Sequence, residues 1–205
     1  MQGAQNKGSI IFQYKFKIMI DKILKTKPGL LIGLSLGPFV LGHIITGVRV
    51  MVISFEDMHK FRDVLSSYQP IAYALLLPMV IISLLWLWAV YARLYPKVPA
   101  KTKMHSLKFK IGFCITAIDF IGMFVFIIFT GNQFNNHLAI IFPLYVLGIF
   151  SLAYCAYFLA KVYKALLLRE TLKFSEYLED FFMFLIPPAG MFTMHAKIKE
   201  LIEKD

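Results

Sequence analysis

Charged side chains are scarce in this sequence. Asp, Glu, Lys and Arg make up 17 % of its 205 residues, whereas hydrophobic residues make up 59 %. A soluble domain has roughly 25 % charged residues, which cover its surface in water. This chain has too little polar surface to enclose a core in water, and we expect lipid to replace it. Its length leaves room for one bundle of helices and no second globular domain.

Cysteines and catalytic motifs are also few. The two cysteines, Cys114 and Cys155, lie inside apolar runs, so they predict small buried side chains rather than a disulfide framework. The sequence has no glycine-rich phosphate loop, no His-Glu-x-x-His and no Cys-x-x-Cys motif. A haem between His43 and His137 is disfavoured, because only His43 is central in a span. We therefore expect a protein that is not an enzyme and holds no cofactor or metal.

The basic residues are grouped rather than dispersed. The net charge of +10 comes from 22 Lys and Arg against 12 Asp and Glu. Basic patches attract phosphates, in nucleic acids as well as in lipid headgroups. Here they cluster beside apolar segments, as the charges next to membrane helices do. We predict contacts with the lipid bilayer and with anionic phospholipid headgroups through Lys and Arg, and no nucleic-acid binding.

Four apolar segments are long enough to cross a bilayer, which takes about 20 apolar residues in a helix. They comprise residues 29–53, 70–94, 111–130 and 138–160. Their apolar residues are continuous rather than alternating, which favours helices over a β-barrel. The sequence thus predicts an all-α integral membrane protein whose four-transmembrane-helix bundle covers residues 29–166.

The distribution of Lys and Arg predicts the orientation of these spans. Residues 1–28 contain six of them, residues 93–110 six and residues 161–204 seven. The first connection has only Lys60 and Arg62, balanced by three acidic residues, and residues 131–137 have none. Because basic connections stay in the cytoplasm, both termini are predicted to be cytoplasmic. A bacterial inner membrane is the expected location of this multi-pass chain.

The segments on either side of the bundle are predicted to be amphipathic interfacial helices. Residues 1–28 interleave lysines with apolar residues, which is typical of a basic helix on an anionic leaflet. Residues 167–205 contain an apolar run that is too short to span and is broken by Pro187, Pro188 and Gly190. We expect two helices that meet at this elbow on the cytoplasmic leaflet. A re-entrant loop and a partner-docking surface are the alternatives.

Two local patterns suggest the boundaries of the membrane. Ser54 and Asp57 have capping-box spacing, which predicts a short separate helix on the outer surface. At the inner side, four aromatic residues predict an interfacial belt. They are Trp86, Trp88, Tyr91 and Tyr95.

The first span carries a stripe of small residues. Gly29, Gly33 and Gly37 recur every four residues and so share one helix face. Glycines in such a stripe let a second helix approach closely. A tight contact within the chain is the simpler hypothesis, and a self-association seam is the alternative.

Ionisable residues inside the spans are the main functional lead, because they are rare at that depth. His43 and Asp119 fall in the middle part of the bilayer, and Arg49 lies near its outer boundary. They predict an intramembrane polar site for an ion or a proton. The structural alternative is an interhelical hydrogen bond that orders the bundle.

These features lead to two functional hypotheses. The first is a non-enzymatic subunit or accessory of a larger membrane complex, which acts through helix–helix and interfacial contacts with a homo- or hetero-oligomeric partner. The second is a small oligomeric ion channel or proton-linked transporter that uses His43 and Asp119. Close approach of these two residues in a cavity would favour transport, and separation would favour the complex subunit.

Overall fold

We describe the chain from a computed structural model, which describes residues 2–56, 58–99, 104–130, 138–168 and 173–203. The elements in these ranges are α1 (Gln2–Lys25), α2 (Pro28–Glu56), α3 (Met58–Leu94), η1 (Tyr95–Lys97), α4 (Ser106–Thr130), α5 (Leu138–Leu168), η4 (Phe174–Glu176), α6 (Leu178–Leu185) and α7 (Pro187–Glu203). Every regular element within the described ranges is a helix. The predicted all-helical fold is therefore confirmed.

Four of these helices contain stretches long and apolar enough to cross a membrane. The stretches are Pro28–Ile45, Tyr73–Lys97, Ser106–Thr130 and Ile141–Leu168. Each overlaps one of the four spans predicted from the sequence. Large apolar side chains on them face outward, for example Phe129 at 85 % and Ile118 at 74 % exposure. Such exposure suits a lipid environment, as expected of a multi-pass membrane protein.

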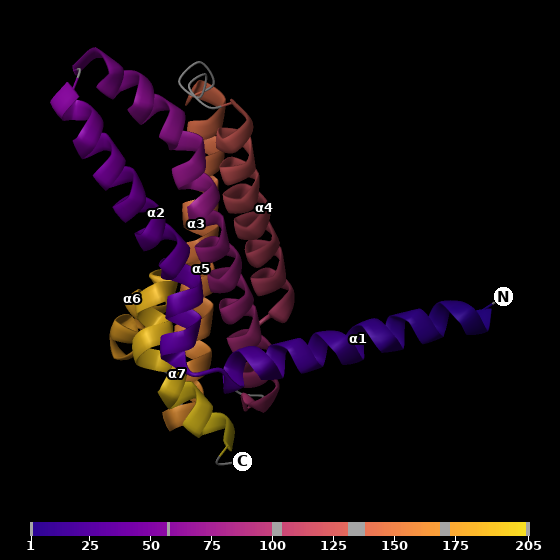
Figure 1. Ribbon diagram of the computed structural model, residues 1–205. Coiled ribbons are helices and arrows are strands. Elements are labelled where there is room, and N and C mark those ends of the chain that lie inside the picture. Colours follow the sequence, from indigo (N-terminus) through magenta and orange to yellow (C-terminus); the bar gives the residue numbers. More distant parts are fainter. Residues whose placement is uncertain (1, 57, 100–103, 131–137, 169–172, 204–205) are drawn as a thin grey trace.

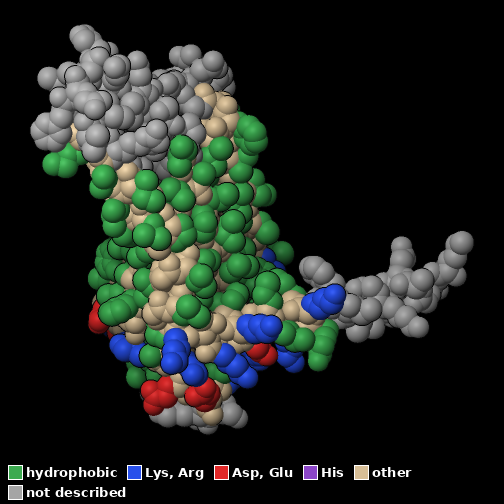
Figure 2. All heavy atoms as spheres, in the orientation of Figure 1, with side chains coloured by type: hydrophobic (Ala, Val, Ile, Leu, Met, Phe, Trp, Pro, Cys, Tyr) green, Lys and Arg blue, Asp and Glu red, His purple; other side chains and the backbone are tan. Residues whose placement is uncertain are grey.

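The four long helices α2 to α5 form an elongated bundle (Figure 1). The C-terminal part of α1 and the helices α6 and α7 lie at one end of this bundle, which we call the base (Figure 1). Helix α1 runs across the base, and its N-terminal part projects sideways beyond the bundle. Figure 2 shows Lys and Arg side chains gathered at the base and along α1, below a wall that is almost entirely hydrophobic on that face.

The C-terminal half of α1 is held to the base by an apolar face and one ion pair. Ile20 and Leu24 are each 6 % exposed and belong to the main hydrophobic core. Phe16 packs edge-on against Trp88, with ring centroids 6.3 Å apart. The Asp21 carboxylate forms an ion pair with the Arg93 guanidinium of α3. Lysines on the remaining faces of this half, such as Lys15, Lys17, Lys22 and Lys25, are exposed.

Aromatic side chains fill the core at the base instead of forming an interfacial belt. Trp86 is fully buried and Tyr91 is 5 % exposed. Tyr91 stacks on Phe109 at 4.2 Å, and Phe109 lies 4.9 Å from Phe158 of α5. The belt predicted from Trp86, Trp88, Tyr91 and Tyr95 is wrong for Trp86, which the hairpin of α6 and α7 covers, and for Tyr91, which packs on Phe109 and Phe158. Trp88 and Tyr95 are half-buried.

The helix that contains the second span begins earlier than the predicted span. Helix α3 runs without a break from Met58 to Leu94, through Pro70 and Pro78. The short separate helix expected after Ser54 is therefore replaced by an extension of α3. Proline near the start or within a long helix is tolerated when neighbouring helices support it, so Pro70 does not mark a boundary here.

The tail forms a helical hairpin that packs into the base. Glu179 and Asp180 lie in the first turn of α6, where the helix dipole favours negative charge. The chain turns at Ile186, and α7 begins at Pro187, a position where the missing backbone N–H is tolerated. Phe184 of α6 and Met191 and Ile198 of α7 are fully buried. The hairpin is thus part of the main core.

Candidate functional site

Asp119 lies in an apolar groove between α4 and α5. The groove has a volume of about 500 Å³. Its lining is hydrophobic except for this carboxylate and the phenol of Tyr145. The lining residues are Ile115, Ile118, Asp119, Gly122, Met123, Phe126, Ile141, Leu144, Tyr145 and Leu147. An apolar groove of this size with one ionisable group has the composition of a binding site.

A glycine on the facing helix makes room for this carboxylate. A Cβ atom added at Gly148 of α5 would overlap the Oδ2 atom of Asp119. Oδ2 is buried, and no hydrogen-bond partner for it is found among the described residues. A buried polar atom without a partner is costly, and more so in hydrocarbon. Asp119 Oδ2 therefore packs against Gly148 without a hydrogen bond from the described part of the chain.

His43 lies on the exposed side of α2. Its Nδ1 atom is 2.9 Å from the carbonyl oxygen of Phe39 in the preceding turn. An Nδ1–H group donates this bond, which leaves Nε2 directed away from its own helix. The imidazole also packs on the Phe39 ring at 3.9 Å. No polar partner for Nε2 is found among the described residues.

The residues predicted to form one intramembrane site are not brought together within a single chain. Helix α3 contacts both α2 and α4 and lies between them (Figure 1). His43 therefore faces outward from one side of the bundle, and Asp119 lies at the α4–α5 groove on the other. Arg49 belongs to α2, but its side chain lies outside the described part of the structure, as does all of His137.

The glycine stripe of α2 is uncovered. A Cβ added at Gly29, Gly33 or Gly37 would meet no atom within 4 Å. The close contact with α3 is made instead by Gly42, against Leu75. Gly33 and Gly37 line a groove of about 520 Å³ between α2 and α3. We expected the stripe to make a tight helix contact within the chain. The structure shows no such contact at Gly29, Gly33 or Gly37.

Ser35 completes a Gly-x-Ser-x-Gly pattern with Gly33 and Gly37, which resembles a hydrolase nucleophile elbow in sequence only. Such an elbow needs a strained turn between a strand and a helix. Here the pattern lies inside α2, and Ser35 is fully buried. Its Oγ donates a hydrogen bond of 3.0 Å to the carbonyl oxygen of Ile32. This serine is therefore a helix-packing residue.

The elbow of the tail reaches well into the bundle. Pro187 and Pro188 line a small, partly open pocket of about 100 Å³, next to the buried Ser83 and Thr116. Gly190 permits the close approach, because a Cβ there would overlap the Met183 carbonyl and lie 2.9 Å from the Trp86 ring. Only glycine or a rearranged neighbour fits this position. The three residues singled out at the elbow thus shape the packing of the hairpin.

His195 was not singled out from the sequence, yet it joins α3 and α7 to the connection between α1 and α2. The Trp86 indole N–H donates to His195 Nδ1 over 3.1 Å, and His195 Nε2–H donates to the Thr26 carbonyl oxygen over 2.9 Å. The residue is 1 % exposed. Burial lowers the pKa of His195, and nearby Lys199 lowers it further, against the bond to Thr26. The sequence could have indicated the burial of His195, because the residue lies on the same helix face as the apolar Met191, Met194 and Ile198.

A second buried polar contact links α5 to the hairpin. The Lys164 Nζ atom lies 3.4 Å from Asp180 Oδ2, and Asp180 is 8 % exposed. The Lys164 ammonium and the Asp180 carboxylate form an ion pair, although no hydrogen bond to Asp180 Oδ2 is found among the described residues. Burial raises the pKa of Asp180, and the charge of Lys164 opposes this. The pair therefore anchors α6 through charge.

These sites are suited to holding helices together. Among the described residues, no group of three or more His, Cys, Asp or Glu side chains is placed to hold a metal ion. No protein-family model, curated protein or solved structure matches this chain. The features that remain to indicate a function are the α4–α5 groove, the glycine stripe of α2, and the polar residues His43 and Asp119.

Proposed function

We propose that the chain is a non-enzymatic subunit or accessory of a larger membrane complex. The observation that carries this proposal is the uncovered glycine stripe of α2. Gly29, Gly33 and Gly37 have open space where a Cβ would be, although the helix bearing them is packed on its other side. Small residues on a lipid-facing surface permit close backbone contact between membrane helices. A second helix from a partner would use this face.

The surroundings of the stripe support a protein partner over lipid alone. The groove beside it has a volume of about 520 Å³ and is lined by Leu34, Pro38 and Leu41 in addition to the glycines. Van der Waals packing of a ridge into such a groove is the principal attraction between helices in lipid. Disordered acyl chains pack less closely against a fixed surface.

The proposed setting is a bacterial inner membrane with both termini in the cytoplasm. The base carries the lysines of α1 and the basic residues around the α3–α4 connection, and Figure 2 shows them together at that end. Basic residues are retained on the cytoplasmic side and attract anionic phospholipid headgroups. In this orientation α1 lies along the inner leaflet.

Transport by one chain receives less support from the geometry. A proton or ion path through His43 and Asp119 would need the two residues to share a polar cavity, and they lie on different sides of α3. We therefore propose the complex subunit as the function, and an ion pathway would require an assembly.

The test is whether the stripe mediates assembly. In mild detergent and in nanodiscs, the wild-type chain is expected to run as a complex on native gels and to crosslink. Gly33→Ile and Gly37→Ile are expected to dissociate that complex, since the added side chains fill the seam. Ala74→Ile, on the exposed side of α3, is the matched control and should leave it intact. A wild-type chain that is monomeric in both media, with no partner, would rule out the proposal.

A further inference from the structure

The elbow at Pro187 and Pro188 lies beside the apolar parts of three long helices. The pocket that the two prolines line is shared with Ser83 of α3, Thr116 of α4 and Leu152 of α5. Each of these three residues belongs to the stretch of its helix that is long and apolar enough to cross a membrane. The tip of the hairpin is therefore level with hydrophobic segments, and not with the ends of these helices.

The basic residues of the same helices give a measure of this depth. Counted from the base, the last basic residues before the apolar runs are Arg93 of α3, Lys110 of α4 and Lys161 of α5. The three residues beside the elbow lie ten, six and nine positions farther from the base. At about 1.5 Å per residue, the elbow is roughly 9–15 Å beyond these charges. One half of a bilayer's hydrocarbon layer is about 15 Å thick, so the elbow lies within that half.

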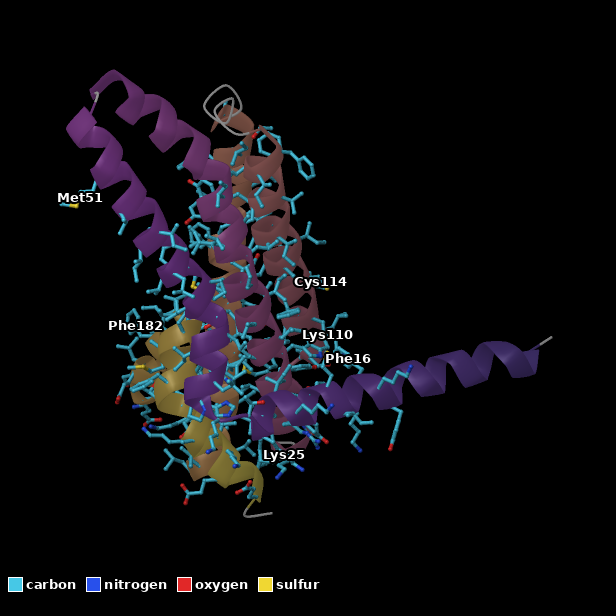
Figure 3. The ribbon with its side chains drawn as sticks, viewed as in Figure 1. Phe16, Lys25, Met51, Lys110, Cys114 and Phe182 are labelled. Carbon is cyan, nitrogen blue, oxygen red and sulfur yellow. The ribbon has the colours of Figure 1, made fainter. Side chains whose placement is uncertain are left out.

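The outer face of the hairpin is apolar near the elbow and charged toward the base. Leu178, Phe182 and Ile186 recur every four residues on one side of α6 and are 38, 50 and 56 % exposed. Figure 3 shows Phe182 pointing away from the bundle. The exposed residues of α7 change from Phe192 near the elbow to Lys197 toward the base. A helix lying flat on a leaflet has polar residues along its whole length, whereas this gradient indicates helices that enter the hydrocarbon.

Polar side chains near the elbow are satisfied within the protein. Residues 181–196 contain no Asp, Glu, Lys or Arg, and their polar side chains are those of Thr193 and His195. The Thr193 hydroxyl donates to the Ala189 carbonyl oxygen over 2.9 Å. Both ring nitrogens of His195 have the partners described above. This stretch therefore needs no water to complete its side-chain hydrogen bonds.

The backbone at the elbow is also suited to an apolar layer, where every N–H group needs a partner in the protein. Pro187 and Pro188 occupy the first two positions of α7, where an N–H group has no acceptor within its helix, and proline has no such group. The Ile186 N–H donates to the Phe182 carbonyl oxygen over 3.2 Å. The Gly190 N–H donates to the Ile186 carbonyl oxygen over 3.0 Å. The double proline thus lets a helix begin inside hydrocarbon with few unpaired donors.

We infer that α6 and α7 form a re-entrant hairpin in the membrane. It enters the half of the hydrocarbon layer nearest the base, turns at the double proline and returns without crossing. Its outer face, with Phe182, Ile186 and Phe192, contacts lipid acyl chains. This hairpin takes the place of the interfacial hairpin expected from the sequence. The inference rests on the bilayer setting proposed above, and it is independent of assembly through the glycine stripe.

Lipid is the neighbour that this face fits. Phe192 is 70 % exposed, and large apolar side chains as open as this form a costly patch in water. In hydrocarbon the same side chains need no protein cover. The outer face also has no small-residue stripe of the kind that lets a second membrane helix approach closely.

Spin labels test the depth of the hairpin. In liposomes, a chain whose two native cysteines are replaced by serine carries Ile186→Cys, Phe192→Cys or Lys197→Cys. Collisions of the label with oxygen, which concentrates in hydrocarbon, are compared with collisions with a water-soluble nickel chelate. Labels at positions 186 and 192 should favour oxygen, as should a label at Ile118→Cys in α4, a position that is 74 % exposed. The label at position 197 should favour the chelate and lie at least about 8 Å shallower than the label at position 186.

Two results of this experiment would overturn the inference. Labels at positions 186 and 192 that collide mainly with the nickel chelate would place the hairpin among headgroups or in water. Labels that are shielded from both reagents would show that a protein surface covers the outer face in place of lipid.

Inserted charges provide a second test. Ile186→Lys should lower the apparent Tm in liposomes by at least about 3 °C more than Ile186→Gln, because the ammonium group is desolvated near the elbow. At the exposed Ala196, next to Lys197, the same two substitutions should differ little. The Tm is read from the reaction of the buried Cys155 thiol in a chain with Cys114→Ser. Equal losses for Ile186→Lys and Ile186→Gln would contradict the inferred depth.

The outcomes separate this inference from the proposed function. A chain that is monomeric but has oxygen-accessible labels at positions 186 and 192 would end the complex-subunit proposal and leave the hairpin standing. A stable complex with chelate-accessible labels at these positions would do the reverse. A label at position 118 that favours the chelate would show that the bilayer setting itself is wrong, and the hairpin inference would fail with it.

Discussion

Removal of the His195 side chain should destabilise the base of the bundle by breaking two hydrogen bonds at once. In His195→Leu the volume is nearly kept, but the Trp86 indole N–H and the Thr26 carbonyl lose their partner. Each orphaned group costs about 1–3 kcal/mol, so a loss of roughly 2–6 kcal/mol is expected in total. The apparent Tm should fall by at least about 4 °C on the scale known for domains of this size.

A thiol-reactive dye provides the assay. Cys155 is 1 % exposed and reacts only when the bundle opens, provided that the exposed Cys114 has been replaced by serine. His195→Gln should lose less than His195→Leu, since an amide can accept from Trp86 and donate to Thr26. His105→Leu, at an exposed position, is the matched control and should change the Tm little. A His195→Leu protein as stable as wild type would refute the role assigned to these bonds.

The same residue predicts a pH dependence. Burial lowers the pKa of His195 below its ordinary value of 6.5, so the unfolded chain takes up the proton first as pH falls. Stability is therefore full above about pH 6.5 and decreases as pH falls from there through the folded-state pKa. A protonated Nδ1 can no longer accept from Trp86, which is the structural cause. The difference in Tm between wild type and His195→Leu should narrow in that window, and a constant difference would contradict the prediction.

Two further substitutions test packing and charge inside the bundle. Gly148→Ala should lower the Tm, at an overpacking cost of about 1–3 kcal/mol, because its Cβ overlaps the Asp119 carboxylate. Gly122→Ala, which has open space at its Cβ, is the control. Equal effects of the two substitutions on the Tm would refute this account. Lys164→Met should lower the Tm at pH 7, because the Asp180 carboxylate loses its positively charged partner. The double variant Lys164→Met/Asp180→Asn should regain part of the lost Tm. A double variant with no higher Tm than Lys164→Met would show that Lys164 acts through packing.

The number and approximate positions of the apolar helices could be predicted, because a helix that crosses a bilayer needs a continuous hydrophobic run of about 20 residues. Residues 29–53 and 111–130 both fall within single helices of the structure. The start of α3 could not be predicted in the same way. Pro70 and the polar residues before it suggest a boundary by local preference, but α3 continues through them because such preferences are weaker than the context of the bundle.

The candidate site shows a similar division. His43 and Asp119 stand out from sequence alone because ionisable side chains are rare in apolar runs. Their environment depends on which helices are neighbours, and this is a property of tertiary packing. The burial of Trp86 and its bond to His195 connect residues 109 positions apart, a pairing that no local pattern encodes. Trp86 was wrongly assigned to an aromatic belt for this reason, because the tail that covers it is distant in sequence.

The hairpin of α6 and α7 has a consequence for the order in which the protein matures. Its residues follow all four spans in the chain, so they leave the ribosome after the spans. Until then the Trp86 N–H has no acceptor from His195, and the pocket that receives Pro187 and Pro188 stands open. The four spans can insert without the hairpin, but the base closes only after the hairpin has been synthesised. A chain released before that point would therefore be inserted yet open at its base, a form that quality-control proteases can distinguish from the folded protein.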